Sequence, residues 1–427
     1  MATLNPYLEG PFAPVSAELT VHDLAVEGEL PAGLEGMYVR NGPNPVFADP
    51  ASYHWFLGQG MLHGVELSGG RASYRNRTVR GNALANTHVV EHAGRLLALV
   101  EVSLPTEVDR GLETVGPFDF GGRLASAMTA HPHTDPETGE MCFIGYDVAG
   151  PPYLRYHVAN RHGELVHSAE ISLPAPTMMH DFAITATRSV LLDLPVVFDL
   201  ALFGSRPFPA AWSPSNGARV GVMPRLGTDA DVVWIDVEPC YAFHVLNAYD
   251  AGDEIVLDLC RYASMFDEDL HGVGGGPARL ERWTIDPAAR KVRTDVVLEV
   301  PVEFPRLDER LVGRRHRTGY LASPQMEDGS FGTARSVGLV AVDLETGRHE
   351  THELGDRAIA SEPVFVPAAD GAEERDGYVL AIVADSRGEH ASDLIVLDAS
   401  DFSGPPLATV HLPQRVPLGF HGSFVRL

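Results

Sequence analysis

Short hydrophobic runs, either continuous or alternating with polar residues, recur along the whole chain. Each has about the length of one β-strand and is bounded by turn-forming sequences such as DPETGE, DAGDE and LETGR. This pattern is typical of strands joined by tight turns. The clearest predicted strands are residues 95–102, 141–148, 189–198, 231–237, 254–260, 337–344, 377–385 and 393–398.

Amphipathic helical windows are scarce, with residues 104–115 as a candidate for one or two helical turns. Many short strands with closely spaced turns indicate a β-sandwich, a barrel or a propeller. A hairpin of strand, DxxxG turn and strand recurs, for example in residues 133–146, and favours a propeller although no regular internal repeat is present. No change in composition marks a linker, so we interpret residues 1–427 as a single domain.

The composition is that of an acidic globular protein. Hydrophobic residues make up 44% of the chain, charged residues 21%, and the formal net charge is −26. Such a charge repels phosphate backbones and argues against nucleic-acid binding. The N-terminal segment lacks the features of a signal peptide, and no run reaches the length of about 18 apolar residues needed to span a membrane. Three cysteines without a spacing motif indicate reduced thiols, so we expect a cytoplasmic protein.

Four of the 19 histidines stand out because they adjoin aromatic, methionine, proline or small residues at expected strand ends: His131, His180, His244 and His421. Taken alone, each fits a core histidine bonded to the backbone. Burying four neutral imidazoles is costly unless each finds a partner, and one shared metal would satisfy all four. His133 competes with His131, but the turn sequence after it is expected to place His133 toward solvent.

The four histidines are far apart in the chain, so no local metal-binding motif explains them. They would meet only through the topology, as the inner strands of a propeller do around its axis. Four imidazoles without a thiolate suit iron, copper, zinc or nickel, and the residues alone leave that choice open. A non-catalytic propeller that binds a ligand or a partner is the alternative from another functional class.

Nine sequence motifs together resemble the carotenoid cleavage oxygenase family, in particular its bacterial members that act on carotenoids and apocarotenoids. They run in order over nearly the whole chain, which makes the set far more specific than any single motif. They are GMYVRNGPNP (36–45), HWFLGQGMLHGVEL (54–67), ANTHVVEHAGRLLALVE (85–101), TAHPHTDPETGE (129–140), MMHDFAIT (178–185), EPCYAFHVLNAYD (238–250), VEFPRLDERLVGRRHR (302–317), SEPVFVP (361–367) and PLGFHGSFV (417–425).

The resemblance implies an all-β fold, a seven-bladed β-propeller with a loop or helical cap over the metal face. It also implies one ferrous, non-haem iron per chain on the propeller axis. The matching ligands are His131, His180, His244 and His421. Three glutamates are implied to support the last three of these histidines in turn, and His131 has no such carboxylate: Glu101 for His180, Glu303 for His244 and Glu362 for His421.

The activity implied by the resemblance is cleavage of one C=C bond of a carotenoid or apocarotenoid into two carbonyl products, with O2 as co-substrate. No catalytic side chain beyond the metal centre is implied. Thr87 matches a residue whose methyl group crowds an open iron position, and Val100 and Phe243 are further candidates for the substrate and oxygen pocket. Outer carboxylates fix the orientation of ligating imidazoles and raise their basicity, which agrees with the three glutamates.

One branch of the family cleaves stilbenes and other phenylpropanoids, and binds the phenol with a lysine directly before the motif glutamate and a nearby tyrosine. Here Val100 occupies the lysine position, and residues 75–82 supply neither lysine nor tyrosine. A valine cannot bind a phenolate, so the sequence favours a carotenoid or apocarotenoid over an aryl-alkene substrate. The stilbene-cleaving activity is the alternative within the family.

Two departures from the family pattern occur in WFLGQGM, where Leu57 and Gln59 replace two aspartates, and we expect only a local effect on the loop. Carotenoids reside in membranes, so an apolar rim around the substrate tunnel is a candidate for peripheral contact with the inner membrane. Residues 118–120 and 200–212 are the segments that would supply this rim. No obligate protein partner is evident.

Overall fold

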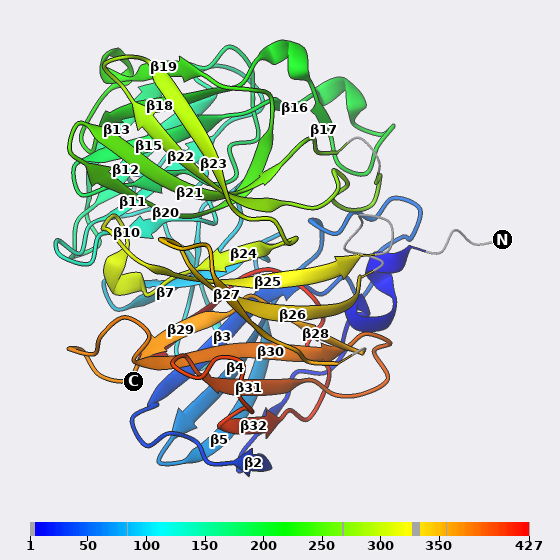
Figure 1. Cartoon of the computed structure of the whole chain (residues 1–427). Helices are drawn as coiled ribbons and strands as arrows, with labels where there is room; N and C mark the ends of the chain where they lie inside the picture. Colours follow the sequence, from blue (N-terminus) through cyan, green and yellow to red (C-terminus); the bar gives the residue numbers. More distant parts are fainter. Residues whose placement is uncertain (1–4, 83, 267–268, 327–333, 356, 427) are drawn as a thin grey trace.

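The computed structural model describes residues 5–82, 84–266, 269–326, 334–355 and 357–426. These residues are almost entirely strands and loops (Figure 1), and the strands form a seven-bladed β-propeller, as predicted. Seven of the eight clearest predicted strands are present as single strands, whereas residues 189–198 are divided between two strands of different sheets. The single-domain interpretation of residues 1–427 stays a prediction.

Strands from the two ends of the described chain complete one blade together. Strand β33 (Gly422–Arg426) pairs antiparallel with β3 (Gly36–Pro43), so that Gly36 lies opposite Arg426. The outer strands of this sheet are β4 (Gly60–Ser68), β5 (Arg71–Thr78) and β1 (Thr20–Val21). Strand β33 comes last in the described chain and β3 comes near its beginning, so the backbone hydrogen bonds between them close the ring of blades.

Four blades follow in chain order, and each is an antiparallel sheet of four strands. The first of these blades consists of β6 (His88–His92), β7 (Arg95–Leu99), β8 (Thr106–Val108) and β9 (Thr114–Pro117), and the second of β10 (His133–Thr134), β11 (Met141–Tyr146), β12 (Leu154–Ala159) and β13 (Leu165–Ile171). The third consists of β14 (Ala183–Ile184), β15 (Arg188–Asp193), β18 (Arg219–Pro224) and β19 (Val233–Asp236). The fourth consists of β20 (Tyr241–Ala251), β21 (Glu254–Tyr262), β22 (Arg279–Asp286) and β23 (Lys291–Leu298).

The candidate helix at residues 104–115 is wrong, because this segment contains β8 and the beginning of β9. Thr106 and Val108 are buried, whereas Glu107 between them pairs with Arg95 across the sheet at 2.6 Å. This alternation has the period of two that belongs to a strand. The strand is only three residues long, which is too short for its pattern to be distinguished from one helical turn.

The remaining two blades share one continuous sheet. The first consists of β24 (Glu303–Arg306), β25 (Thr318–Met326), β26 (Ala334–Asp343) and β27 (His349–His352), and the second of β29 (Val364–Pro367), β30 (Gly377–Asp385), β31 (Asp393–Asp398) and β32 (Ala408–His411). Strand β28 (Ala358–Ala360) bridges them by pairing with both β26 and β30. Strand β2 (Val26–Gly28) extends the second blade at its outer edge.

A cap of loops and short turns covers one face of the propeller. It includes a two-stranded sheet of β16 (Val196–Phe198) and β17 (Ala210–Trp212), and the 3-10 turns η1 (Pro6–Leu8), η2 (Gly10–Phe12) and η3 (Leu200–Leu202). Three further 3-10 turns lie in connecting loops: η4 (Pro214–Asn216), η5 (Asp229–Asp231) and η6 (Glu309–Leu311). Among the described residues we find no helix with the length and apolar character to cross a membrane.

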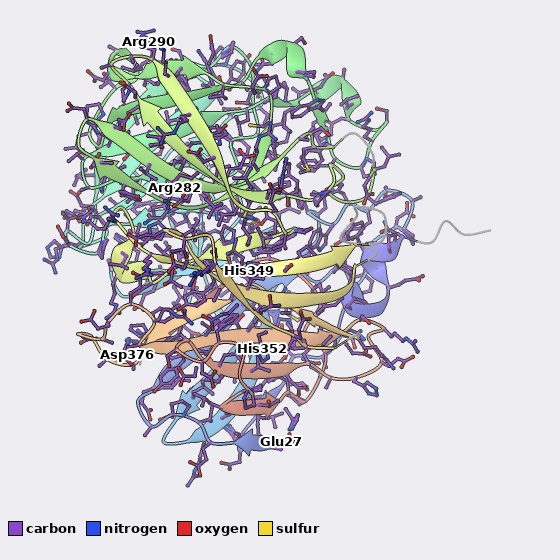
Figure 2. The ribbon with its side chains drawn as sticks, in the orientation of Figure 1. Glu27, Arg282, Arg290, His349, His352 and Asp376 are labelled. Carbon is purple, nitrogen blue, oxygen red and sulfur yellow. The ribbon has the colours of Figure 1, made fainter. Side chains whose placement is uncertain are left out.

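The blades pack on one another through apolar side chains. The largest core cluster contains Ile144, Leu191, Leu257 and Trp283, which come from β11, β15, β21 and β22 in three consecutive blades. Charged residues such as Glu27 and Arg290 lie at the periphery (Figure 2) and are exposed. The three cysteines are buried and form no disulfide.

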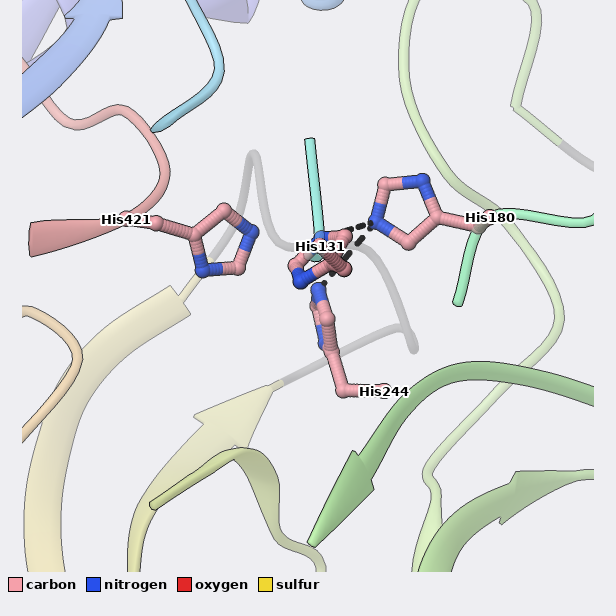
Figure 3. A group of neighbouring side chains, drawn as sticks. All are labelled: His131, His180, His244 and His421. Atoms are coloured by element: carbon pink, nitrogen blue, oxygen red, sulfur yellow. Dashed lines mark hydrogen bonds between the residues drawn. The ribbon is translucent and has the colours of Figure 1, made fainter. Parts of the chain in front are cut away.

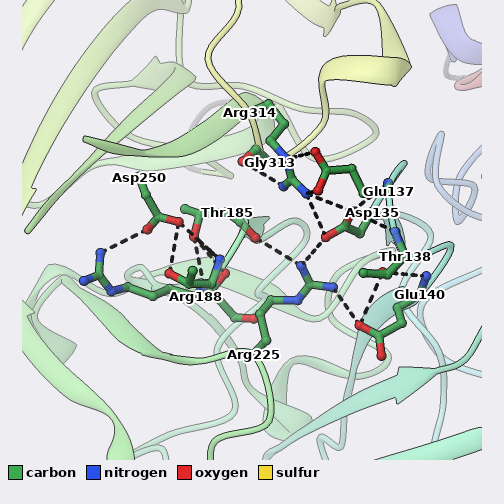
Figure 4. Close-up of polar contacts among 12 residues, drawn as sticks. Asp135, Glu137, Thr138, Glu140, Thr185, Arg188, Arg225, Asp250, Gly313 and Arg314 are labelled. Carbon is green, nitrogen blue, oxygen red and sulfur yellow. Dashed lines mark hydrogen bonds and ion pairs between the residues drawn. The ribbon is translucent and has the colours of Figure 1, made fainter. Parts of the chain in front are cut away.

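A buried ionic network ties neighbouring blades together near the ends of their strands (Figure 4). Arg225, which follows β18, donates to Asp135 Oδ2 at 3.1 Å and to the Thr185 carbonyl at 3.0 Å. Arg314, from the loop before β25, donates to Asp135 Oδ1 at 3.2 Å. Asp135 follows β10, so the network joins three segments that are distant in the chain. It fixes the relative position of blades whose inner strands carry His131 and His180.

Candidate metal centre

The four candidate histidines lie at the beginnings of four innermost strands. His131 precedes β10, His180 precedes β14, His244 lies near the start of β20, and His421 directly precedes β33. Because these strands surround the propeller axis, their first residues meet at its centre, as the topology argument predicted. Figure 3 shows the four imidazoles directed toward one another from separate strands and loops.

The imidazole nitrogens lie at distances that suit a shared metal ion. His131 Nε2 lies 3.0 Å from His180 Nε2, and His180 Nε2 lies 3.3 Å from His244 Nε2. One nitrogen of each of the four rings lies within 4.8 Å of the others. Two nitrogens bound at right angles to one ion with bonds of about 2.1 Å would be about 3.0 Å apart. The donor set therefore fits a transition-metal ion without rearrangement.

Carboxylates contact the Nδ1 atoms of three of these histidines. Glu303 Oε2 lies 2.5 Å from His244 Nδ1, and Glu362 Oε1 lies 2.9 Å from His421 Nδ1. Glu101 Oε1 contacts His180 Nδ1. Among the described residues no carboxylate contacts His131 in this way, which matches the pairing implied by the family resemblance.

The neutral tautomers that follow from these contacts leave no proton between His180 and His244. A carboxylate accepts only when Nδ1 carries the proton, so Nε2 of the same ring presents a lone pair. Nε2 atoms of His180 and His244 nevertheless approach to 3.3 Å. Lone pairs at this distance repel one another unless a cation lies between them. This is the observation of the structure that most directly indicates a metal site.

Burial and neighbouring charges set the protonation of the site. Burial lowers the pKa of His131 well below its ordinary value, and the nearby His421 and His180 lower it further. Burial also holds the pKa of His421 well below its usual value, although Glu362 opposes this. Both rings are thus neutral at physiological pH, the form that binds a metal.

At His244 and Glu362, charged neighbours shift the pKa in the direction opposite to the effect of burial. Burial alone would lower the pKa of His244, but the Glu303 carboxylate raises it above its ordinary value. Burial raises the pKa of Glu362, and the Arg306 guanidinium and His421 outweigh this, so its pKa lies below the usual range. Arg306 Nη1 donates to Glu362 Oε2 at 2.9 Å, which keeps this carboxylate ionised and oriented.

Several residues of the site were not predicted from the sequence. His88, at the start of β6, is buried and its ring centroid lies 5.1 Å from that of His421. Tyr146 donates its hydroxyl proton to Glu101. Phe304 stacks on His244 with ring centroids 5.2 Å apart and adopts a φ of 52°, which non-glycine residues rarely do. His88 lies between Thr87 and Val89, so the criterion of aromatic, methionine, proline or small neighbours did not select it.

The expectation for His133 is wrong. His133 is partly buried, lies in strand β10 rather than in a turn, and its Nε2 lies 2.9 Å from Asp181 Oδ1. His133 and Thr134 form β10 and pair with β11, and the turn begins only after Thr134. A two-residue strand gives no pattern that the sequence could have revealed.

An apolar cavity extends from the histidines into the cap. Its walls include the three predicted pocket residues Thr87, Val100 and Phe243, with His180, His244 and His421 at its inner end. Cap residues Trp55, Phe56, Phe198 and Phe208 supply further aromatic surface. Leu57 also lines the cavity, so its effect reaches beyond the loop, whereas Gln59 instead donates to the Val79 carbonyl at 3.2 Å.

Comparison with known proteins places the chain in a family. The family model described as retinal pigment epithelial membrane protein (RPE65) matches residues 12–85 and 80–426. The chain is 40% identical over 492 aligned positions to the carotenoid cleavage oxygenase of Mycobacterium tuberculosis, covering 98% of this chain and 97% of that protein. The chain therefore belongs to the RPE65/carotenoid oxygenase family.

Two solved structures illustrate the range of the family. The lignostilbene dioxygenase of Pseudomonas brassicacearum has 30% sequence identity and a TM-score of 0.91, with 99% of this chain and 98% of that chain covered. Cobalt-substituted apocarotenoid oxygenase (ACO) of Synechocystis has 26% identity and a TM-score of 0.85, with 97% of each chain covered. The fold thus occurs in a family that includes proteins named for both substrate classes.

Proposed function

We propose that this protein is a non-haem iron(II) dioxygenase that cleaves one C=C bond of a carotenoid or apocarotenoid into two carbonyl products. The observation that carries the proposal is the convergence of four imidazoles at the inner end of an apolar cavity. The M. tuberculosis relative named carotenoid cleavage oxygenase supports the reaction class.

We propose His131, His180, His244 and His421 as the ligands of one ferrous ion, with Glu101, Glu303 and Glu362 as their carboxylate partners. A ferrous ion held there would bind and activate O2 for addition to an electron-rich double bond. The cobalt-substituted Synechocystis structure supports a divalent transition metal in this family. The choice of iron follows the family resemblance.

The side chains of the apolar cavity would bind and orient the substrate. Phe243 lies edge-on to His180 with ring centroids 5.1 Å apart, so an alkene resting on Phe243 lies beside the proposed metal. Thr87 lines the cavity and donates its hydroxyl to Asn86 Oδ1 at 3.0 Å, so the hydroxyl is already engaged. Tyr146 is committed to Glu101 and offers no free hydroxyl to the substrate. These residues exclude water and leave an apolar polyene as the best-matched occupant.

The substrate class is argued from what lines the cavity near the metal. Val100 is buried in its wall, at the position where a lysine would be needed to bind a phenolate. Among the described residues that line this cavity, none is lysine or arginine. The likeness to a lignostilbene dioxygenase keeps a stilbene or phenylpropanoid substrate as the second candidate. The apolar wall favours the carotenoid or apocarotenoid.

Peripheral membrane contact is proposed for part of the cap. Within residues 200–212, Leu200 and Phe203 are 48% and 64% exposed, and they adjoin Phe198 at the cavity wall. Such a surface can enter the interfacial region of a bilayer and receive an apolar substrate. Segment 118–120 is less suited, because Phe118 packs against Phe120 and Phe120 is buried. We propose a cytoplasmic protein that docks transiently on the inner membrane.

Product analysis tests the proposed function. The purified protein, loaded anaerobically with Fe2+, is exposed to air with a panel of carotenoids, apocarotenals and 4-hydroxystilbenes. We expect apocarotenals or carotenoids to give two carbonyl fragments with the highest kcat/KM. Faster turnover of a 4-hydroxystilbene than of every polyene would establish the second candidate instead.

Metal analysis separates both enzymatic functions from a non-catalytic propeller. We expect about one iron per chain after loading and desalting, as four converging imidazoles require. A protein that retains no stoichiometric iron would favour the non-catalytic alternative. Variants of the proposed ligands to alanine should each lose the metal while retaining the fold.

A further inference from the structure

The four histidines lie between two cavities of different character. The apolar cavity reaches His180, His244 and His421, whereas a second cavity of about 420 Å3 reaches His131 and His244. We call the second one the axial cavity, because residues that follow the centre along the innermost strands form its walls. Glu91, Thr134 and Glu309 line its outer part and are exposed to solvent.

Ionisable side chains line the axial cavity from its exposed end to the histidines: Glu91, Glu309, His133, Asp181, His88 and Glu362. Its two arginines are engaged by acidic partners. Arg306 contacts Glu309 and donates to Glu362 at 2.9 Å, and Arg310 donates to Asp308 at 2.6 Å. The lining thus combines oxygen and imidazole donors with little free positive charge, which is the chemistry that attracts a divalent cation.

His133 lies between the exposed end and the centre. It follows His131 by two residues, at the first position of β10, and both side chains line the axial cavity. Its Nε2 lies 2.9 Å from Asp181 Oδ1, while Asp181 also accepts from the backbone N–H of Phe182 at 2.7 Å and of Val245 at 2.8 Å. Because Nε2–H of the partly exposed His133 donates to Asp181, its Nδ1 carries a lone pair that can bind a cation entering the cavity.

We propose that the axial cavity is the route by which the metal ion reaches the four histidines, with Glu91 attracting the cation and His133 serving as a transient ligand. The inference rests on the proposed metal centre. A hydrated dication would have to lose its water ligands to cross the apolar cavity, and the apolar walls offer few polar atoms to replace them. The axial cavity supplies carboxylate and imidazole donors, so water can be replaced one ligand at a time. His131 lines the axial cavity and is absent from the apolar cavity, so the axial cavity is the only one of the two that reaches all the way to this histidine.

Metal uptake kinetics test this route. The apoprotein, prepared with a chelator under anaerobic conditions, is mixed with Co2+, and the change in visible absorption reports ligation; Fe2+ uptake is followed by rapid desalting and elemental analysis. We expect Glu91→Lys to slow uptake by about tenfold at low salt, because a charge at the mouth of a cavity alters cation capture. We expect His133→Ala to slow it several-fold. His133→Ala leaves Asp181 with its two backbone donors, so the fold is retained.

A route and a structural role differ in one measurable respect. A barrier along a route changes uptake and release by the same factor and leaves the equilibrium affinity unchanged. We therefore expect metal release to a chelator to slow in parallel with uptake in both variants. A weaker affinity with unchanged uptake would overturn the proposal, as would uptake and release equal to those of the wild-type chain. Because Glu91 is exposed on the surface, its variant decides the matter even if His133→Ala does not fold.

Two matched variants serve as controls. His167→Ala removes a half-buried histidine of β13 whose Nε2 bonds to the Gly227 carbonyl at 2.9 Å, away from both cavities. Glu170→Lys reverses a surface glutamate paired with Arg155 at 3.6 Å, comparable to Glu91 with Arg110 at 3.1 Å. Both should take up Co2+ at the wild-type rate.

Excess apocarotenal, which fills the apolar cavity, should leave metal uptake unchanged. Slower uptake in its presence would overturn the proposed route. A wild-type chain that binds neither Co2+ nor Fe2+ would instead refute the proposed function itself.

Discussion

At the scale of single residues, the contact on Nδ1 decides which imidazole nitrogen faces the centre. His244 with Glu303 and His421 with Glu362 both present Nε2 inward. The sequence indicated the histidines through their apolar neighbours, whereas the glutamates were indicated only by the family resemblance. A glutamate beside an apolar run is usually a solvated charge, so its burial cannot be inferred locally. His88 was overlooked because its neighbours Thr87 and Val89 do not meet the criterion that selected the four histidines.

Removing one carboxylate tests the importance of this orientation. We expect Glu303→Gln to weaken iron affinity by about 10–100-fold, because the amide no longer fixes the His244 tautomer or raises its basicity. Competition with a chromophoric chelator measures the affinity. Glu281→Gln is the matched control, since Glu281 is also a buried strand glutamate but accepts from Trp283 Nε1 at 3.2 Å, away from the metal. Equal affinity of Glu303→Gln and wild type would contradict the assigned role.

Val100, in the wall of the apolar cavity, gives a second prediction, which concerns the choice of substrate. Val100→Lys places an ammonium beside the substrate, and desolvation of this charge should lower kcat/KM for an apocarotenal by about tenfold or more. The same variant should gain activity on a 4-hydroxystilbene, whose phenolate the lysine can bind. Val100→Leu keeps the wall apolar and should change neither value greatly. If Val100→Lys retained full apocarotenal activity, Val100 would not contact the substrate path.

At the scale of elements, every proposed ligand depends on where an innermost strand begins. The long strands were predictable because their apolar runs are continuous, as in β30 and β31. The short β8 and β10 were not, since two or three residues carry no measurable period. Of these two, β10 is the innermost strand of its blade and the one that positions His131 and His133. Local sequence patterns are thus least informative where the site is built.

Strand β33 carries both a ligand and the closure of the ring, and two changes separate these roles. Removal of residues 419–427 should abolish iron binding and lower the thermal midpoint, because His421 and the pairing of β33 with β3 are both lost. His421→Ala should abolish iron binding alone and leave the apoprotein midpoint close to that of wild-type apoprotein. Elemental analysis and calorimetry distinguish the outcomes. A truncated chain that still holds iron would refute the assignment of His421.

At the scale of the whole molecule, the number of blades could not be counted from the sequence. The two joined blades share a sheet through β28, and strand lengths differ between blades, so no regular repeat appears. The resemblance to a known family supplied the blade number and the cap. The contacts between blades, such as the Arg225 network, arise from loops that no local pattern brings together.

The Arg225 network gives a prediction at this scale. Arg225→Ala should lower the free energy of unfolding by about 2 kcal/mol, because Asp135 is left buried with fewer partners. Arg293→Ala is the control: Arg293 is 69% exposed and pairs with Asp295 of the same strand at 3.2 Å, so its loss should cost less than about 1 kcal/mol. Guanidinium denaturation of the apoproteins measures both. Equal losses would contradict the role of the buried pair in joining blades.

Ring closure by β33 also bears on how the protein is made. His421 and β33 follow every other ligand and every other described strand in chain order. A nascent chain that has not emerged as far as residue 421 therefore holds three of the four imidazoles, and one edge of β3 still lacks its partner β33. Products truncated before residue 421 would therefore lack one of the four proposed metal ligands.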